Sequence, residues 1–171
     1  TYFDLEDIFL EDGDQSDSRT LSEWSGTLGS VYHMNEATHF YTNISTVFET
    51  PTTTELAKDP SGGSGFNPNL NSQKSINYEI GLKNKTYKNN ELNLALFLIQ
   101  SRDELIPFEL DESPGNTFYK NTGKSRRVGL EFMAVYHPIN FIRTSLSYTY
   151  SNFKFTEFSD NGIDQADKFI P

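Results

Sequence analysis

The sequence predicts an all-β protein, an antiparallel up-and-down meander of about seven long strands that crosses a membrane. Three observations predict this fold class. Apolar and polar residues alternate along several runs, and the last of these continues for about fifteen residues, whereas ordinary strands average about five or six. Aromatic residues make up 14% of the chain, which suits the aromatic girdles of membrane barrels. Short and long connections between the runs also alternate along the chain.

The clearest alternation lies in two runs joined by a turn at residues 137–140. Side chains of a strand point to its two faces in turn, so residues two apart share a face. One face of the two runs holds Val128, Leu130, Phe132, Ala134, Tyr136, Ile142, Thr144, Leu146, Tyr148 and Tyr150. The opposite face of the second run holds Arg143, Ser145, Ser147, Thr149 and Ser151. A long hairpin with this pattern indicates a wall between lipid and water.

Four earlier segments show the same period of two. We expect strands at residues 27–34, 38–49, 76–83 and 91–100, and a weaker strand at residues 2–10. In the fourth of these segments, one face consists of Leu92, Leu94, Leu96 and Leu98. Such a strand needs either a protein core or lipid against its apolar face.

The connections between these strands alternate in length. Short ones are expected at 35–37, 84–90 and 137–140, and long ones at 11–25, 51–75, 101–125 and from 157 on. In a meander every second connection lies at the same end, so the short turns share one end, as in outer-membrane barrels. The segment 51–75 contains Ser-Gly-Gly-Ser-Gly, so a flexible linker between two domains is an alternative there. Similar strands on both sides favour a loop of one domain.

Composition excludes several classes of protein. The net charge is −10, and its acidic excess lies in residues 1–25 and 157–171, so the chain is not a nucleic-acid binder. The absence of cysteine excludes disulfides and thiolate metal sites. No stretch approaches the ~20 apolar residues of a membrane helix, although barrel strands carry their signal in alternation instead. The chain begins with Thr1 and shows no signal peptide, so we expect an excerpt of a longer protein.

The motifs that carry enzyme or metal chemistry are incomplete, so we expect no enzyme, cofactor or metal site. Ser64 lies between two glycines, but Phe66 stands where a nucleophile elbow requires a further glycine. The acidic residues 12–17 lack the glycine and glutamate of an EF-hand and are interpreted as a solvated loop. Three histidines flank the short turns and are interpreted as polar residues near the membrane interface: His33, His39 and His137.

Several segments, taken in order, resemble the β-barrel of TonB-dependent outer-membrane receptors. They are FETPT (48–52), GFNPNL (65–70), YEIGLK (78–83), RDELIPF (102–108), FYKNTG (118–123) and RRVGLE (126–131). The resemblance covers roughly residues 24–171 and is most similar to the ferric-citrate and siderophore type. It implies a barrel of about 22 strands with a plugged lumen. Residues 1–171 would then be one partial barrel domain, without the plug, the segment that engages TonB, and the closing strands.

The resemblance implies active import of a ferric chelate across the outer membrane, energised by the TonB complex. Outer-membrane lipid would be a further partner. An importer of a glycan or of cobalamin on the same scaffold is an alternative. Two others are a soluble β-sandwich binding module and an adhesin or passive porin.

Four cations are the candidate ligand-binding residues: Arg102, Lys124, Arg126 and Arg127. They lie at the two ends of the predicted long loop 101–125, and ferric chelates are anionic. Charge-assisted hydrogen bonds from such cations would favour capture of the chelate. The alternative is that these are basic residues at the lipid headgroup boundary.

Overall fold

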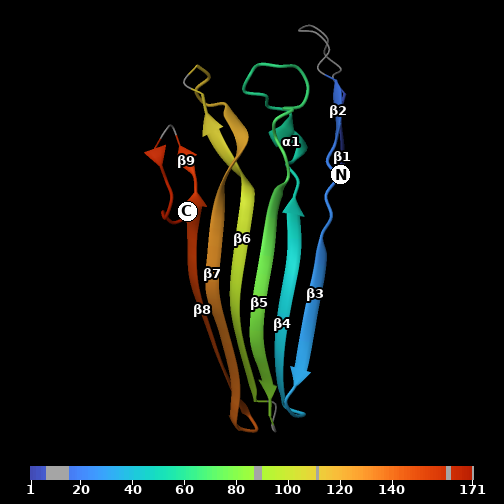
Figure 1. The fold of residues 1–171 in the computed structure, drawn as a ribbon. Helices are drawn as coiled ribbons and strands as arrows, with labels where there is room; N and C mark the ends of the chain where they lie inside the picture. Colours follow the sequence, from blue (N-terminus) through green and yellow to red (C-terminus); the bar gives the residue numbers. More distant parts are fainter. Residues whose placement is uncertain (7–15, 87–89, 111, 161–162, 171) are drawn as a thin grey trace.

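Six long strands form one antiparallel sheet in the computed structural model, which describes residues 1–6, 16–86, 90–110, 112–160 and 163–170 (Figure 1). The order of the strands in the sheet follows their order in the chain, which confirms the predicted meander. The strands are β3 (Gly26–His33), β4 (Thr38–Glu49), β5 (Gln73–Lys85), β6 (Glu91–Glu109), β7 (Thr117–Ile139) and β8 (Ile142–Glu157). Among the described residues there are thus six long strands where the sequence predicted about seven.

The remaining strands are short and lie in two separate pairs. At the N-terminus, β1 (Tyr2–Leu5) pairs with β2 (Asp17–Thr20), so part of the predicted acidic loop is a strand. The acidic residues 12–15 lie outside the described residues. At the C-terminus, β9 (Ser159–Asp160) pairs with β10 (Ile163–Asp164), where the sequence indicated an irregular tail.

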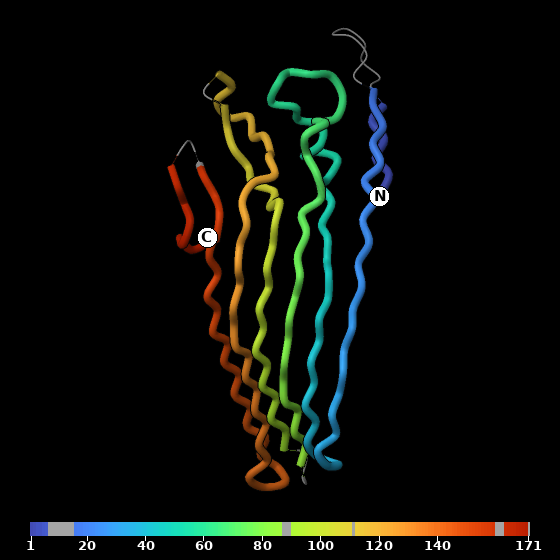
Figure 2. Tube along the Cα trace, in the orientation of Figure 1, coloured from blue at the N-terminus to red at the C-terminus, as the bar shows by residue number. Residues whose placement is uncertain are grey.

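Short turns gather at one end of the sheet and long connections at the other (Figures 1 and 2). The short turns join β3 to β4, β5 to β6 and β7 to β8. We call this the short-turn end and the opposite end the loop end. The predicted grouping of the short turns at one end is confirmed, but the connection between β6 and β7 spans only residues 110–116 and is not the long loop that the sequence predicted.

The sheet has one apolar and one polar face. Between the short-turn end and the loop end, even-numbered positions of β4 to β8 form the apolar face. Odd-numbered positions form the other face, called the polar face, which also holds Phe97, Ile99 and Val135. In one cross-strand row of the apolar face, Ile80 pairs with Leu96, Leu96 with Leu130, and Leu130 with Tyr150. The side chains of Ile80, Leu96 and Tyr150 are 55%, 45% and 52% exposed.

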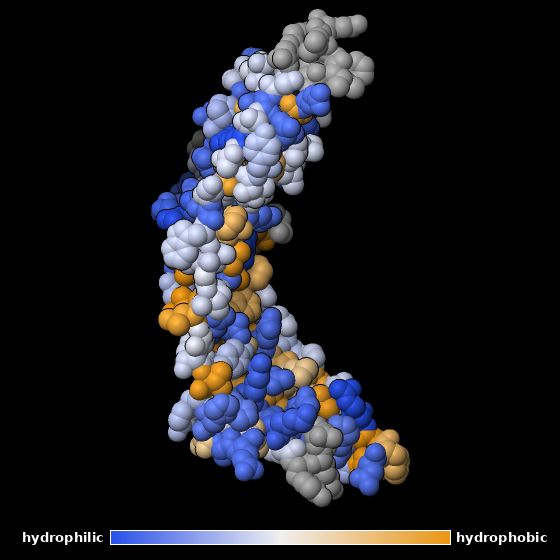
Figure 3. All heavy atoms as spheres, turned by 90° about the vertical axis from the view of Figure 1, so that its right-hand side faces the viewer, coloured by the Kyte–Doolittle hydropathy of each residue, from blue (hydrophilic) through white to orange (hydrophobic). Residues whose placement is uncertain are grey.

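No second sheet covers the apolar face in the part of the chain that the structure describes, which argues against the β-sandwich alternative. Figure 3, seen from the β3 edge, shows a curved molecule with hydrophobic residues at its surface. The alternation therefore does not serve a protein core. No helix among the described residues is long and apolar enough to cross a membrane.

The predicted loop 101–125 is largely strand, which corrects the sequence analysis. β6 continues to Glu109 and β7 already begins at Thr117, and the two remain paired throughout. The strands bend where Asp103 and Gly123 adopt positive φ angles of 57° and 76°. Glycine adopts this conformation without steric cost, whereas Asp does so less often.

The segment between β4 and β5 is an ordered cap at the loop end and not a flexible linker. A helical turn, α1 (Thr53–Leu56), begins with a capping box in which Thr52 and Glu55 exchange hydrogen bonds. Leu56, Phe66 and Leu70 are almost fully buried and pack with Phe3 of β1 into a small hydrophobic core.

The N-terminal strands hold this cap in place. Arg19 of β2 donates a hydrogen bond to the carbonyl oxygen of Pro68 at 3.1 Å. The carboxylate of Asp17 accepts one from the backbone N–H of Phe66 at 2.9 Å. Asn121 of β7 donates a hydrogen bond to the carbonyl oxygen of Asn71 at 2.8 Å, so the cap is also joined to the six-stranded sheet.

Candidate functional site

The four predicted ligand-binding cations lie near one another at the loop end but on opposite faces of the sheet. Arg102 of β6 pairs directly with Lys124 of β7, and Arg126 follows two residues later on the same face. Arg127 points to the opposite face, because neighbouring residues of a strand alternate. The sequence numbers alone could have assigned Arg127 to the other face, because it is odd-numbered and the other three cations are even-numbered.

Arg127 belongs to a hydrogen-bonded network on the polar face. Its guanidinium donates to the carboxylate of Glu104 at 3.0 Å and to the hydroxyl of Ser101 at 3.3 Å. The hydroxyl of Ser125 also donates to Glu104. Ser101 in turn lies 2.9 Å from the hydroxyl of Ser75, so the network links β5, β6 and β7.

Sequence reasoning missed Glu104, the buried centre of this network. Glu104 is an even-numbered residue of β6, and strict alternation would place it with the apolar face. Asp103, the residue before Glu104, has a positive φ angle that changes the direction of the strand. The side chain of Glu104 therefore joins the polar face. The alternation of the sequence alone does not indicate this placement.

The polar face carries further charged side chains between this network and the short-turn end. The hydroxyl of Tyr41 donates to Glu79 at 2.6 Å, and the ammonium of Lys83 lies 5.1 Å from the centre of the Tyr41 ring. Charged groups on this face are thus held by neighbours on adjacent strands.

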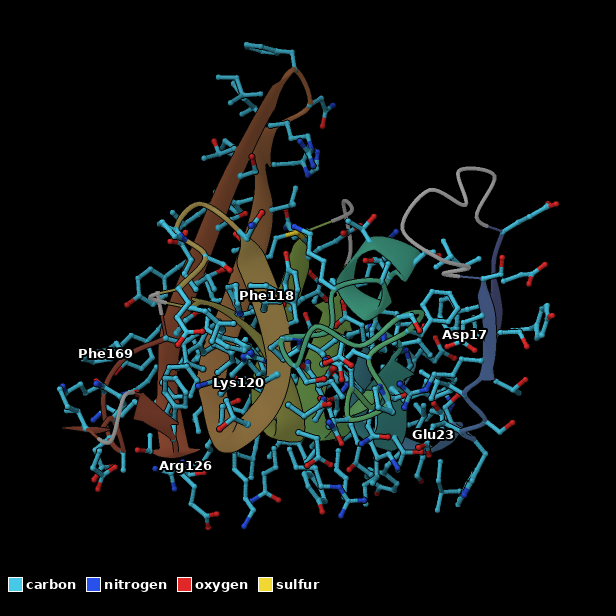
Figure 4. All side chains as sticks on the ribbon, turned by 90° about the horizontal axis from the view of Figure 1, so that it is seen from above. Asp17, Glu23, Phe118, Lys120, Arg126 and Phe169 are labelled. Carbon is cyan, nitrogen blue, oxygen red and sulfur yellow. The ribbon has the colours of Figure 1, made fainter. Side chains whose placement is uncertain are left out.

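The other three cations line a cleft of about 640 Å³ on the apolar face, which we call the basic cleft. Lys74 of β5 is a fourth cation of its wall, and Trp24 and Phe48 contribute aromatic surface. Glu23 also lines it, and Figure 4, seen from the loop end, labels Arg126 and Glu23 on the same side of the sheet.

Two cations of the basic cleft have carboxylate partners. Lys74 pairs with Glu23 at 2.5 Å, and Lys124 pairs with Glu157 at 2.7 Å. Arg102 and Arg126 form no ion pair with any residue that the structure describes. The cleft therefore keeps two guanidinium groups without a carboxylate partner.

Two histidines meet at the short-turn end. The Nδ1 atoms of His33 and His39 lie 2.8 Å apart across β3 and β4, whereas His137 lies on β7. Across the described ranges, no group of three or more His, Cys, Asp or Glu side chains could hold a metal ion.

The family is decided by a comparison with protein-family models. The model described as "TonB dependent receptor-like, beta-barrel" matches residues 2–170. This chain belongs to that family. Its members are outer-membrane proteins of bacteria.

A solved structure described as "Copper transporter OprC" has a similar fold. Its TM-score to this chain is 0.66 at 19% sequence identity, and the match covers 85% of this chain. The match covers 22% of the OprC chain, so the present chain spans about a fifth of that protein.

Proposed function

We propose that this sheet is part of the barrel wall of a receptor that imports a ferric siderophore or ferric citrate across the outer membrane. The single-layer sheet is the observation that carries the proposal. Its apolar face suits lipid, and its opposite face bears the fixed charges of Arg127, Glu104 and Glu79. A wall with these two faces fits a barrel with a polar interior.

The edges of the sheet require further strands. Among the described residues β3 pairs on one side only, and β8 has a second partner only near its loop end, where residues 153–155 bond to residues 167–170. Unpaired backbone groups cannot face hydrocarbon. Further strands, from the same protein or from other copies, would complete the barrel. In the proposed receptor a plug inside this barrel closes the passage, and energy transmitted by TonB displaces it.

Arg127 is the predicted ligand-binding residue that faces the polar side. Its planar guanidinium offers N–H donors beyond those given to Glu104 and Ser101, and carboxylates of a ferric chelate match that geometry. The predicted ligand contacts of Arg102, Lys124 and Arg126 would require the chelate to approach on the apolar face.

Copper is a second candidate cargo. The structure of similar fold is described as a copper transporter, and His33 and His39 present two imidazoles on the polar face. Imidazole is a suitable ligand for copper.

Uptake by the full-length receptor in its own membrane tests these proposals. We expect cells that express it to accumulate radioactive iron supplied as ferric citrate or a ferric siderophore, and to stop doing so when TonB is deleted. Accumulation of copper, a glycan or cobalamin without ferric chelates would overturn the assignment of the cargo.

The matched variants Arg127→Lys and Arg126→Lys test the ligand contact. Both keep the charge and lose the planar guanidinium, but they lie on opposite faces. Arg127→Lys should weaken chelate binding about tenfold, the effect of one strong hydrogen bond, and Arg126→Lys should not. Equal effects would show that the chelate does not distinguish the two faces.

A further inference from the structure

We propose that the basic cleft binds the phosphate groups of a phosphorylated lipid in the outer leaflet. This inference concerns the lipid side of the sheet and does not depend on the cargo of the receptor. The cleft opens on the apolar face, at the end of the sheet that carries the long loops.

The position of the cleft along the strands matches the level of lipid headgroups. The last row of the apolar face that is apolar on β4 to β7 contains Ile44, Tyr78, Leu98 and Val128, and it ends at Asn152 on β8. Arg126 belongs to the next row towards the loop end, and Lys74, Arg102 and Lys124 share the row after that. Each row is about 7 Å from the next along a strand. The cations therefore begin where the hydrocarbon ends.

The arrangement of the cations suits a phosphate. Arg102 and Arg126 lie on adjacent strands as diagonal neighbours, a relationship that places Cα atoms about 7–8 Å apart. A phosphate between them could accept hydrogen bonds from both guanidinium groups, and neither group has a carboxylate partner within the described residues.

The two lysines of the cleft can contribute as well. Lys74 and Lys124 are partly or largely exposed, and the same is true of their partners Glu23 and Glu157. Exposed ion pairs of this kind are weak, so a doubly charged phosphate can compete for the ammonium groups. Lys124 lies directly beside Arg102, and both therefore face the same headgroup.

The apolar part of the cleft suits the acyl chains of the same molecule. Phe48 and Ile76 line it beside the cations, and Ile76 is followed on the same face of β5 by Tyr78 of the apolar face. Trp24 forms its edge and is 82% exposed. Tryptophan is enriched at membrane interfaces, where its ring lies at the headgroup level.

The location favours a lipid over a free anion or the transported ligand. The cleft and the polar face lie on opposite sides of the sheet, so a chelate inside the barrel would not reach Arg102 or Arg126. A free phosphate would use the cations and leave the apolar lining unused. A lipid that carries phosphate on its headgroup uses both parts.

Binding of lipid A to the purified full-length receptor in detergent tests the proposal. The three probes are bis-phosphorylated lipid A, lipid A from which both phosphates have been removed, and inorganic phosphate. The variant is Arg102→Gln combined with Arg126→Gln. Arg143→Gln removes an exposed cation from β8 near the short-turn end and serves as the matched control.

We expect the double variant to bind bis-phosphorylated lipid A at least about tenfold more weakly, since it loses two charge-assisted contacts. Arg143→Gln should bind it like the unmodified receptor, and the dephosphorylated lipid should bind all three proteins equally. Unchanged affinity of a folded double variant would overturn the proposal. Competition by millimolar inorganic phosphate would also overturn it, in favour of a site for free anions.

If the double variant does not fold, the salt dependence of lipid binding tests the proposal instead. In the unmodified receptor, raising the salt concentration should weaken binding of bis-phosphorylated lipid A much more than binding of the dephosphorylated lipid. Equal salt dependence would overturn the proposal. If the folded double variant loses chelate uptake but keeps its affinity for lipid A, Arg102 and Arg126 would instead be assigned to the transported ligand.

Discussion

Glu104 of β6 and Arg127 of β7 form an ion pair of 3.0 Å in which the glutamate side chain is 7% exposed. Removal of the arginine would leave a buried carboxylate without its cation. We expect Arg127→Gln to destabilise the barrel by about 3–5 kcal/mol, as for other buried pairs that lose one partner. The midpoint of denaturant unfolding of the detergent-folded receptor measures this loss.

The double variant Glu104→Gln with Arg127→Gln is the control for this prediction. It contains no buried unpaired charge, so it should be more stable than Arg127→Gln alone. A double variant whose loss equals the sum of the two single losses would show that the two residues do not interact.

Gly129 should not tolerate a side chain. A Cβ atom there would overlap the ring of Phe97 and lie 2.8 Å from the carbonyl oxygen of Tyr150, which is backbone and cannot move aside easily. We expect Gly129→Ala to cost about 1–3 kcal/mol through overpacking. Unfolding midpoints provide the measurement. Gly29→Ala is the control, because its Cβ would meet its nearest neighbour at an ordinary 3.5 Å.

The sequence predicted the body of the sheet because most even-numbered residues there are apolar. The bounds of β4 match the predicted residues 38–49, and the apolar face contains the predicted residues. The upper parts of β6 and β7 were missed because Pro107 and Gly123 are typical of loops. β5 no longer pairs with β6 beyond Arg102, so Pro107 lies on an edge where its missing N–H is tolerated.

The candidate site was predicted only in part. The four cations lie together at the loop end, as expected from the sequence, and their parity assigns them to two faces. The partner of Arg127 was not predictable, because the conformation of Asp103 moves Glu104 out of strict alternation. The ion pair of Lys74 with Glu23 depends on where the segment before β3 lies relative to β5, which no local pattern indicates.

Tyr150 and Thr149 are neighbours on β8 that test which face meets lipid. Tyr150 lies in the middle of the apolar face, whereas Thr149 pairs with Glu131 on the polar face. Tyr150→Arg should cost about 2–4 kcal/mol, the effect of a cation near the bilayer midplane of a barrel. Thr149→Arg should cost little, because the new cation meets Glu131. Stability in lipid vesicles is the measurement, and the reverse order would exchange the two faces.

The 171 residues expressed alone should not form a soluble monomer. The apolar face is exposed, and in the described part of the chain the outer edge of β3 and most of the outer edge of β8 have no backbone partner. Exposed edges and apolar surface promote association, so we expect oligomers or aggregates without detergent. Size-exclusion chromatography with light scattering measures the mass in buffer and in detergent. A detergent-free monomer with a cooperative thermal transition would mean that the apolar face is covered by protein, and the sheet would then not be a membrane wall.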